Sequence, residues 1–159
     1  MGTAHALGID GADPIIAKTF DRYPVLEPDE LWLFAHGPTG TEFERGQIER
    51  LDIRRTSLED VATDPAAAAA ATLEVFARDV DRVAVQFDVY VVDFMDLPLS
   101  ENADRNLGLT LDASMDALAV VLVHPAVAAL TVTELNPAHD PDGSAIVRFV
   151  ERLAGAFPG

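Results

Sequence analysis

One apolar run in the middle of the chain constrains the fold more than any other feature. Residues 83–92 read Val-Ala-Val-Gln-Phe-Asp-Val-Tyr-Val-Val, and most of them are aliphatic and β-branched. Such a run is typical of a strand that is covered on both faces of a parallel sheet. Asp88 stands inside it, and an unpaired buried carboxylate is costly. The run therefore predicts a central strand in which Asp88 is partnered by a metal ion, another cation or backbone N–H groups.

Strand and helix patterns alternate on both sides of this run. Strands are predicted over residues 30–35, 51–54 and 127–135, and helices over 14–23, 41–50, 63–78, 110–124 and 144–156. This alternation favours βαβ units, a mostly parallel sheet and helices on both of its faces. We therefore expect a single α/β domain over residues 1–159, with three αβα layers.

The composition excludes several classes of function. The chain has 27 acidic and 11 basic side chains and a formal net charge of −16, so nucleic acid and anionic membranes would repel it. It has no cysteine, which excludes disulfides and thiolate chemistry. It also has no run of about 18 apolar residues and no visible signal peptide. A cytoplasmic protein is the expectation.

Acidic residues stand near the carboxyl ends of the two clearest strands. Asp88 lies late in the first strand, and Glu134 follows Leu130-Thr131-Val132-Thr133 in the second. Ligands of parallel α/β sheets bind beyond the carboxyl ends of the strands. If the strands are neighbours, the two carboxylates form an acidic pocket for a divalent cation or a cationic substrate. The alternatives are a structural Asp88 that is hydrogen-bonded to a loop, and a Glu134 that caps a helix or points into solvent.

Other polar residues carry weaker signals. The four histidines show no metal-ligand spacing, and His139 is expected in solvent at a turn. The acidic residues that follow Asp93 are interpreted as a solvated face. These acidic residues are Asp96, Glu101, Asp104 and Asp112.

Two motifs resemble those of the arginase, agmatinase and formiminoglutamase (ureohydrolase) family. The stretch Gln86-Phe87-Asp88-Val89-Tyr90-Val91-Val92-Asp93-Phe94 resembles the family signature Ser-Phe-Asp-x-Asp-x-x-Asp-Pro. The stretch Thr133-Glu134-Leu135-Asn136-Pro137 resembles the family element Glu-Val-Asn-Pro. The resemblance is specific over residues 83–143, and it is to the carboxyl-terminal half of the usual enzyme.

The resemblance implies half of the arginase fold and a defined chemistry. The family hydrolyses guanidino, amidino or formimino C–N bonds with two manganese ions. By resemblance, Asp88 is at a metal-ligand position and Glu134 binds the cationic group of the substrate. Asp93 matches the third aspartate of the signature and is interpreted as loop-shaping.

The chain departs from the family at its metal ligands. Tyr90 replaces the second aspartate of the signature, and a phenol with a pKa of about 10 is a poor manganese ligand. The Gly-Asp-His and Asp-Ala-His-x-Asp segments that supply the family's other ligands do not occur in the chain. A hydrolytic dimetal site needs more than one inherited aspartate.

Three hypotheses follow, and the first is preferred. The chain is a degenerate or split ureohydrolase subunit that completes a sheet and a manganese site with a partner chain, and is inactive alone. Alternatively, Tyr90, Asp88 and Glu134 form a new acid–base site in a stand-alone enzyme. Lastly, the chain is a non-catalytic homo-oligomeric module with a vestigial metal site. Whether it is a natural half or a truncated one stays open.

Overall fold

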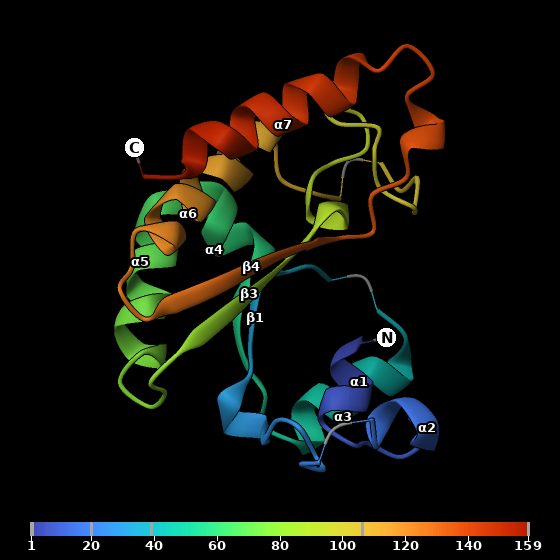
Figure 1. Ribbon diagram of the computed structural model, residues 1–159, viewed down its shortest axis with the longest axis vertical. Helices are drawn as coiled ribbons and strands as arrows, with labels where there is room; N and C mark the ends of the chain where they lie inside the picture. The colour runs from blue at the N-terminus through green and yellow to red at the C-terminus, as the bar shows by residue number, and fades with distance from the viewer. Residues whose placement is uncertain (1, 20, 39, 106, 159) are drawn as a thin grey trace. The chain divides into compact units, whose positions relative to one another are not determined.

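Helices and strands alternate along the chain, as Figure 1 shows for the computed structural model. The structure describes residues 2–19, 21–38, 40–105 and 107–158. The strands are β1 (Trp32–His36), β2 (Arg54–Ser57), β3 (Val83–Asp88) and β4 (Val127–Thr133). The α-helices are α1 (Gly2–Ala6), α2 (Pro14–Ala17), α3 (Glu42–Arg50), α4 (Leu58–Thr63), α5 (Pro65–Phe76), α6 (Leu111–Leu122) and α7 (Ser144–Ala156). The 3-10 helices are η1 (Pro28–Glu30), η2 (Val89–Val91) and η3 (Pro137–His139).

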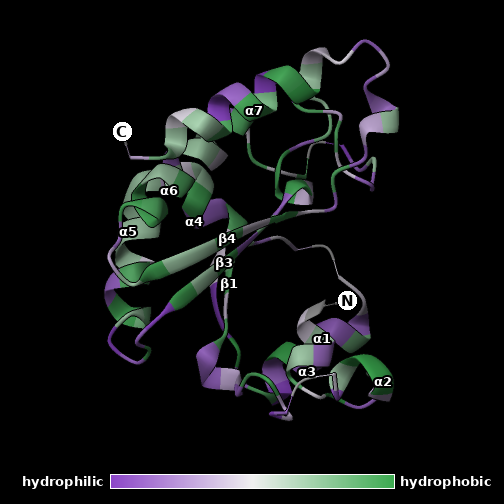
Figure 2. Cartoon of the chain, in the orientation of Figure 1, coloured by the Kyte–Doolittle hydropathy of each residue, from purple (hydrophilic) through white to green (hydrophobic). Residues whose placement is uncertain are grey.

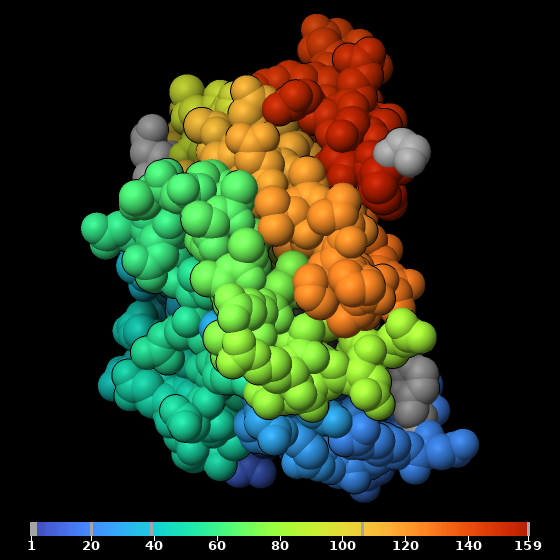
Figure 3. All heavy atoms as spheres, turned by 90° about the vertical axis from the view of Figure 1, so that its left-hand side faces the viewer, coloured from blue at the N-terminus to red at the C-terminus, as the bar shows by residue number. Residues whose placement is uncertain are grey.

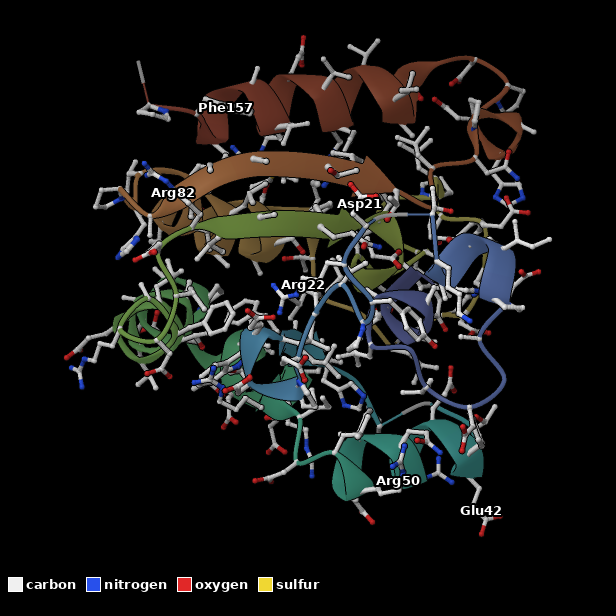
Figure 4. All side chains as sticks on the ribbon, turned by 60° about the horizontal axis from the view of Figure 1, so that its bottom comes forward. Asp21, Arg22, Glu42, Arg50, Arg82 and Phe157 are labelled. Carbon is white, nitrogen blue, oxygen red and sulfur yellow. The ribbon has the colours of Figure 1, made fainter. Side chains whose placement is uncertain are left out.

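The chain divides into two compact units. The first comprises Met1–Leu33 and Thr39–Arg55, and the second comprises Phe34–Pro38 and Thr56–Gly159. Helices α1, α2 and α3 belong to the first unit, where the carbonyl of Ala6 accepts hydrogen bonds from two N–H groups of the segment at 25–26. Arg22, labelled in Figure 4, forms an ion pair with Glu30 in the same unit. Whether one ureohydrolase-like domain spans residues 1–159 stays a prediction.

The second unit is built around the parallel pair β3–β4 (Figure 1). Val85 pairs with Leu130 and Phe87 pairs with Val132, and all four side chains belong to the main hydrophobic cluster. Helices α6 and α7 contribute Met115 and Phe149, among others, to this cluster. One face of the strand pair therefore packs on a helical layer.

Helices α5, α6 and α7 adjoin one another in this unit. On the side seen in Figure 3, the green atoms of α5, the orange atoms of α6 and the red atoms of α7 follow in that order. Local sequence starts two of them: the Asp64 side chain caps α5 at Ala67 N–H, and Thr110 caps α6 at Ala113 N–H. Pro65 occupies the first position of α5, where a missing N–H costs nothing.

The predicted central strand is shorter and less covered than its sequence indicates. It was expected over 83–92, but β3 ends at Asp88, because the chain turns there into η2. Ala84 and Gln86 are exposed, so within the described residues the face opposite the helical layer is open. The prediction of a strand covered on both faces is wrong for this chain alone.

Two further boundaries also differ. The strand expected at 51–54 lies at Arg54–Ser57, because Leu51 caps α3 and Asp52 turns the chain with a φ of 51°. The helix expected at 14–23 ends at Ala17. The fold class itself, an α/β arrangement with parallel strands, is confirmed, and within the described residues β3–β4 carries a helical layer on one face. No helix of the described residues is long and apolar enough to cross a membrane.

Candidate functional site

The structure places the two predicted site carboxylates on one edge of the sheet. Asp88 is the last residue of β3 and pairs with Thr133, and Glu134 follows Thr133 directly. The strands are parallel neighbours, so both acids stand at carboxyl ends. We call this edge, which carries Asp88, Tyr90 and Glu134, the rim. The sequence predicted a common edge only if the two strands were neighbours, and the parallel pairing of β3 and β4 meets this condition.

The Asp88 side chain is hydrogen-bonded to the backbone of the turn that follows it. Its Oδ1 atom accepts a hydrogen bond of 2.9 Å from the Tyr90 N–H, and this bond caps η2. The side chain is half-buried. The partner that a buried aspartate requires is thus supplied, at least for one oxygen, by an ordinary amide group. This geometry favours the structural alternative for Asp88 in the chain alone.

Tyr90 is turned toward a different carboxylate from those of the predicted acid–base site. Because the strand ends at Asp88, Tyr90 lies within η2 and does not continue the strand's alternation. Its hydroxyl donates a hydrogen bond to the Asp104 carboxylate. The new acid–base site of Tyr90, Asp88 and Glu134 gains no support from this contact.

Glu134 occupies a backbone conformation that L-residues seldom adopt. Its φ is 60°, in the left-handed region, and its side chain is exposed. Its carbonyl accepts a hydrogen bond of 3.0 Å from the Glu101 N–H, and the Asn136 N–H donates to the Leu99 carbonyl. The neighbouring loop therefore holds the segment that carries Glu134, and the glutamate is presented outward at the rim.

Asp93 joins the two ends of the loop that follows η2. Its Oδ1 accepts from the Met95 N–H at 2.8 Å and its Oδ2 from the Gly108 N–H at 3.4 Å. Gly108 lies so close that an added Cβ would stand 2.4 Å from the Asp93 nitrogen. These two hydrogen bonds connect the start and the end of the loop, and the loop-shaping role that the resemblance implies for Asp93 stays a prediction.

The Asp96 carboxylate contacts two helices, α6 and α7. Its Oδ2 accepts from the Leu111 N–H at 2.6 Å, and its Oδ1 pairs with the Arg148 guanidinium at 2.9 Å. Burial of the carboxyl group raises its pKa, but the Leu111 N–H and Arg148 more than offset this, so the pKa of Asp96 lies below its usual value. The loop is thereby attached to the start of α6 and to α7.

The loop acids Glu101, Asp104 and Asp112 are exposed, as the interpretation of a solvated face expects, whereas Asp96 is half-buried. The exposed acids also have partners. Glu101 accepts a hydrogen bond from the Asn136 amide, and Asp112 forms an ion pair with Arg152 of α7. His139 is likewise held: its Nδ1 lies 3.0 Å from the Ser100 carbonyl, and its ring contacts Phe94 edge-on. The sequence carries no signal for these pairs, since most join residues that are more than 30 positions apart.

The donors of this chain do not fit a manganese centre by themselves. Across residues 2–19, 21–38, 40–105 and 107–158, no three His, Asp or Glu side chains are grouped so that they could hold a metal ion. Tyr90 at the altered ligand position is engaged with Asp104, and Asp88 with the Tyr90 amide. The roles of Asp88, Glu134 and Asp93 in a reaction stay predictions.

Comparisons with known proteins bear on the fold. No protein-family model matches the sequence, and no curated protein does. Among solved structures, the arginase of Bacillus caldovelox superposes on 99% of this chain with a TM-score of 0.86 and 19% identity. The arginase of Bacillus cereus covers 98% with a TM-score of 0.85 and 18% identity, and a Trypanosoma cruzi formiminoglutamase covers 84% with a TM-score of 0.65 and 19% identity.

These likenesses involve only part of each neighbour. The matches cover 52%, 53% and 48% of those three chains, respectively. This chain therefore spans about half the length of the structures that it resembles. It has a ureohydrolase-like fold of half the usual size.

Proposed function

We propose that this chain is a degenerate or split ureohydrolase-type subunit. It completes a sheet with a partner chain, and only the complex hydrolyses the C–N bond of a guanidino- or amidino-type substrate. The observation that carries the proposal is the extent of the structural match, which takes in nearly all of this chain and half of an arginase. If this chain takes part in an enzyme of that fold, the other half of the fold must come from another chain.

The rim is suited to a cation. Asp88 and Glu134 end neighbouring parallel strands, and Glu134 is exposed. A guanidinium or amidinium group is planar, positively charged and recognised by carboxylates. In the complex, Glu134 would bind this group and Asp88 would face the partner's donors.

The remaining donors of a manganese site must come from the partner. Within the described residues, this chain has no set of side chains that could hold the metal. A metal that lowers the pKa of bound water needs a full set of ligands, so the isolated chain is expected to be inactive.

A second function is favoured by one contact. The Asp88 carboxylate is bound by the Tyr90 amide, and the tyrosine stands where the family has a ligand. This contact supports a vestigial rim, as in the alternative of a non-catalytic, homo-oligomeric module. Metal binding and activity separate the two functions.

Hydrolysis in a mixture tests the proposal. The chain is combined with the product of an adjacent reading frame that encodes Gly-Asp-His and Asp-Ala-His-x-Asp segments, and manganese-dependent release of urea or ammonia is measured on arginine, agmatine and formiminoglutamate. We expect release from the mixture and from neither chain alone.

Matched variants assign the activity to the rim. Glu134→Gln keeps the shape of the side chain and removes its charge, and we expect at least a hundredfold loss of kcat/KM. Glu74→Gln, at an exposed position of α5 that pairs with Arg78, is the control and should leave kcat/KM unchanged. A stable complex without hydrolysis on any of the three substrates would favour the vestigial module.

A further inference from the structure

Strands β3 and β4 have the sequences of interior strands but lack outer neighbours. Within the described residues they form a sheet of two, so each has one unpaired edge. Residues 83–87 read Val-Ala-Val-Gln-Phe, and 127–133 read Val-Ala-Ala-Leu-Thr-Val-Thr, without a charged residue or a proline. Figure 2 shows β4 in green to white along its length. Soluble proteins protect real edge strands with charges or proline. Strand β4 carries neither, and β3 carries only Asp88, at its carboxyl end.

Strand β2 provides the contrast within the same chain. Its four residues begin with Arg54 and Arg55. Arg55 is exposed, and Arg54 stacks on Trp32 with its guanidinium carbon 5.2 Å from the ring centre. This is the sequence of a strand that ends a sheet. The chain thus places two charges in the short strand β2, and leaves β4 and the part of β3 before Asp88 uncharged.

The face of β3–β4 opposite the helical layer is open as well. Ala84, Gln86, Ala129 and Thr131 are exposed there, and the Gln86 amide donates to the Thr133 hydroxyl across the pair. Parallel strands are normally covered on both faces, so this surface requires a second layer. Arg82, labelled in Figure 4, directly precedes β3 and lies outside the uncharged stretch.

The charge of the chain decides between a second copy and a different polypeptide. Each copy carries a net charge of −16 and has a pI of about 4.3. Charges of one sign at this level keep proteins apart, most strongly at low ionic strength. A second copy also brings the same open edges, whereas about half of an arginase chain lies outside the match.

We propose that a different and less acidic polypeptide adds strands to the outer edges of β3 and β4 and covers the face of Ala84, Gln86, Ala129 and Thr131. This inference rests on the proposed function and names the surface and the kind of partner. The partner contributes uncharged strands and its own layer.

The test compares lysines on the open face with lysines on α7. Gln86→Lys/Thr131→Lys places two charges on exposed strand positions. Val147→Lys/Val150→Lys places two charges on α7 side chains that are each 55% exposed. The tagged chain and both variants are isolated from cells of the source organism, and the partner is sequenced. Hydrogen exchange of residues 83–88 and 127–133 is then measured in the wild-type complex and in the chain alone.

We expect a partner of different sequence and higher pI, protection of both strands in the complex, and at least tenfold weaker binding for the strand variant only. Recovery of the chain only as a monomer or with copies of itself overturns the inference. So does a complex that tolerates the strand lysines or leaves the strands unprotected. A complex that forms through these strands but hydrolyses none of the substrates overturns the proposed function alone. An active complex whose binding is not weakened by the strand lysines overturns this inference alone.

Discussion

Gly108 shows how closely the loop at the rim is packed. An added Cβ would stand 2.4 Å from the nitrogen and 2.8 Å from the Cα of Asp93, and both are backbone atoms that cannot move aside cheaply. The absence of a side chain at Gly108 allows this close approach, next to the isolated β-bridge that pairs Val92 with Leu109. A side chain of any size here must displace the loop.

Substitution of Gly108 tests this packing. We expect Gly108→Ala to lower the free energy of unfolding by about 2–4 kcal/mol, because overpacking against backbone forces a shift. Gly46→Ala in α3 is the control: nothing lies within 4 Å of its added Cβ, and alanine should stabilise the helix by up to about 1 kcal/mol. Urea unfolding of both variants checks the pair. Equal stability of Gly108→Ala and wild type would show that the loop is not packed as described.

Asp96 makes a pH-dependent contribution to stability. Asp96→Asn keeps an acceptor for the Leu111 N–H but loses the charge that Arg148 pairs with, and we expect a loss of about 1–2 kcal/mol at pH 7. The pKa of Asp96 is lowered on folding, so its contribution is complete above the ordinary value of 3.8 and disappears as pH falls through the lower, folded value.

Urea unfolding of wild type and Asp96→Asn between pH 7 and pH 2.5 measures this contribution. The difference between them should be constant at neutral pH and should shrink below pH 4. A difference that grows as the pH falls would contradict the assigned sign.

Helices were predicted best where capping and turn residues mark their ends. Asp64-Pro65 and Thr110 start α5 and α6 as expected, and Ser144–Ala156 is a helix with the predicted bounds. Strand lengths were predicted less well, because an apolar run does not show where the backbone turns. The run at 83–92 contains both β3 and η2, and the Asp88 side chain accepts a hydrogen bond from the Tyr90 N–H where the strand passes into η2.

The start of α6 can be tested as an element. The Thr110 hydroxyl accepts from the Ala113 N–H at 3.1 Å, next to Asp96 at the same helix end. Thr110→Ala should cost about 1 kcal/mol, because one free N–H of the first turn loses its partner. Thr110→Ser keeps the hydroxyl and should remain close to wild type in thermal unfolding. Equal losses in both variants would assign the effect to packing of the threonine methyl group.

The candidate site was predicted in its position and not in its contacts. The sequence predicted that Asp88 and Glu134 share an edge if their strands are neighbours, and the register of β3 and β4 shows that they are. The partners of Tyr90, Asp96 and Glu101 come from distant segments that carry no matching pattern. Long-range pairs of this kind depend on how helices and loops pack, which sequence periodicity does not report.

At the scale of the whole molecule, the proposed function makes the chain one part of a sheet. Nearly all of it matches half of an arginase, its parallel strands have open edges, and its described carboxylates do not gather into a metal centre. These three observations have one explanation if the other half is a separate polypeptide. The rim then becomes functional only when the partner's side chains face Asp88 and Glu134.

Calorimetric titration with manganese tests this claim most directly. It is applied to the chain alone, to the complex with its partner, and to the complex with Asp88→Asn. We predict no stoichiometric binding to the chain alone, binding to the complex, and at least tenfold weaker binding when the Asp88 carboxylate is removed. Stoichiometric binding to the chain alone, or a complex whose affinity is unchanged in Asp88→Asn, would contradict the account.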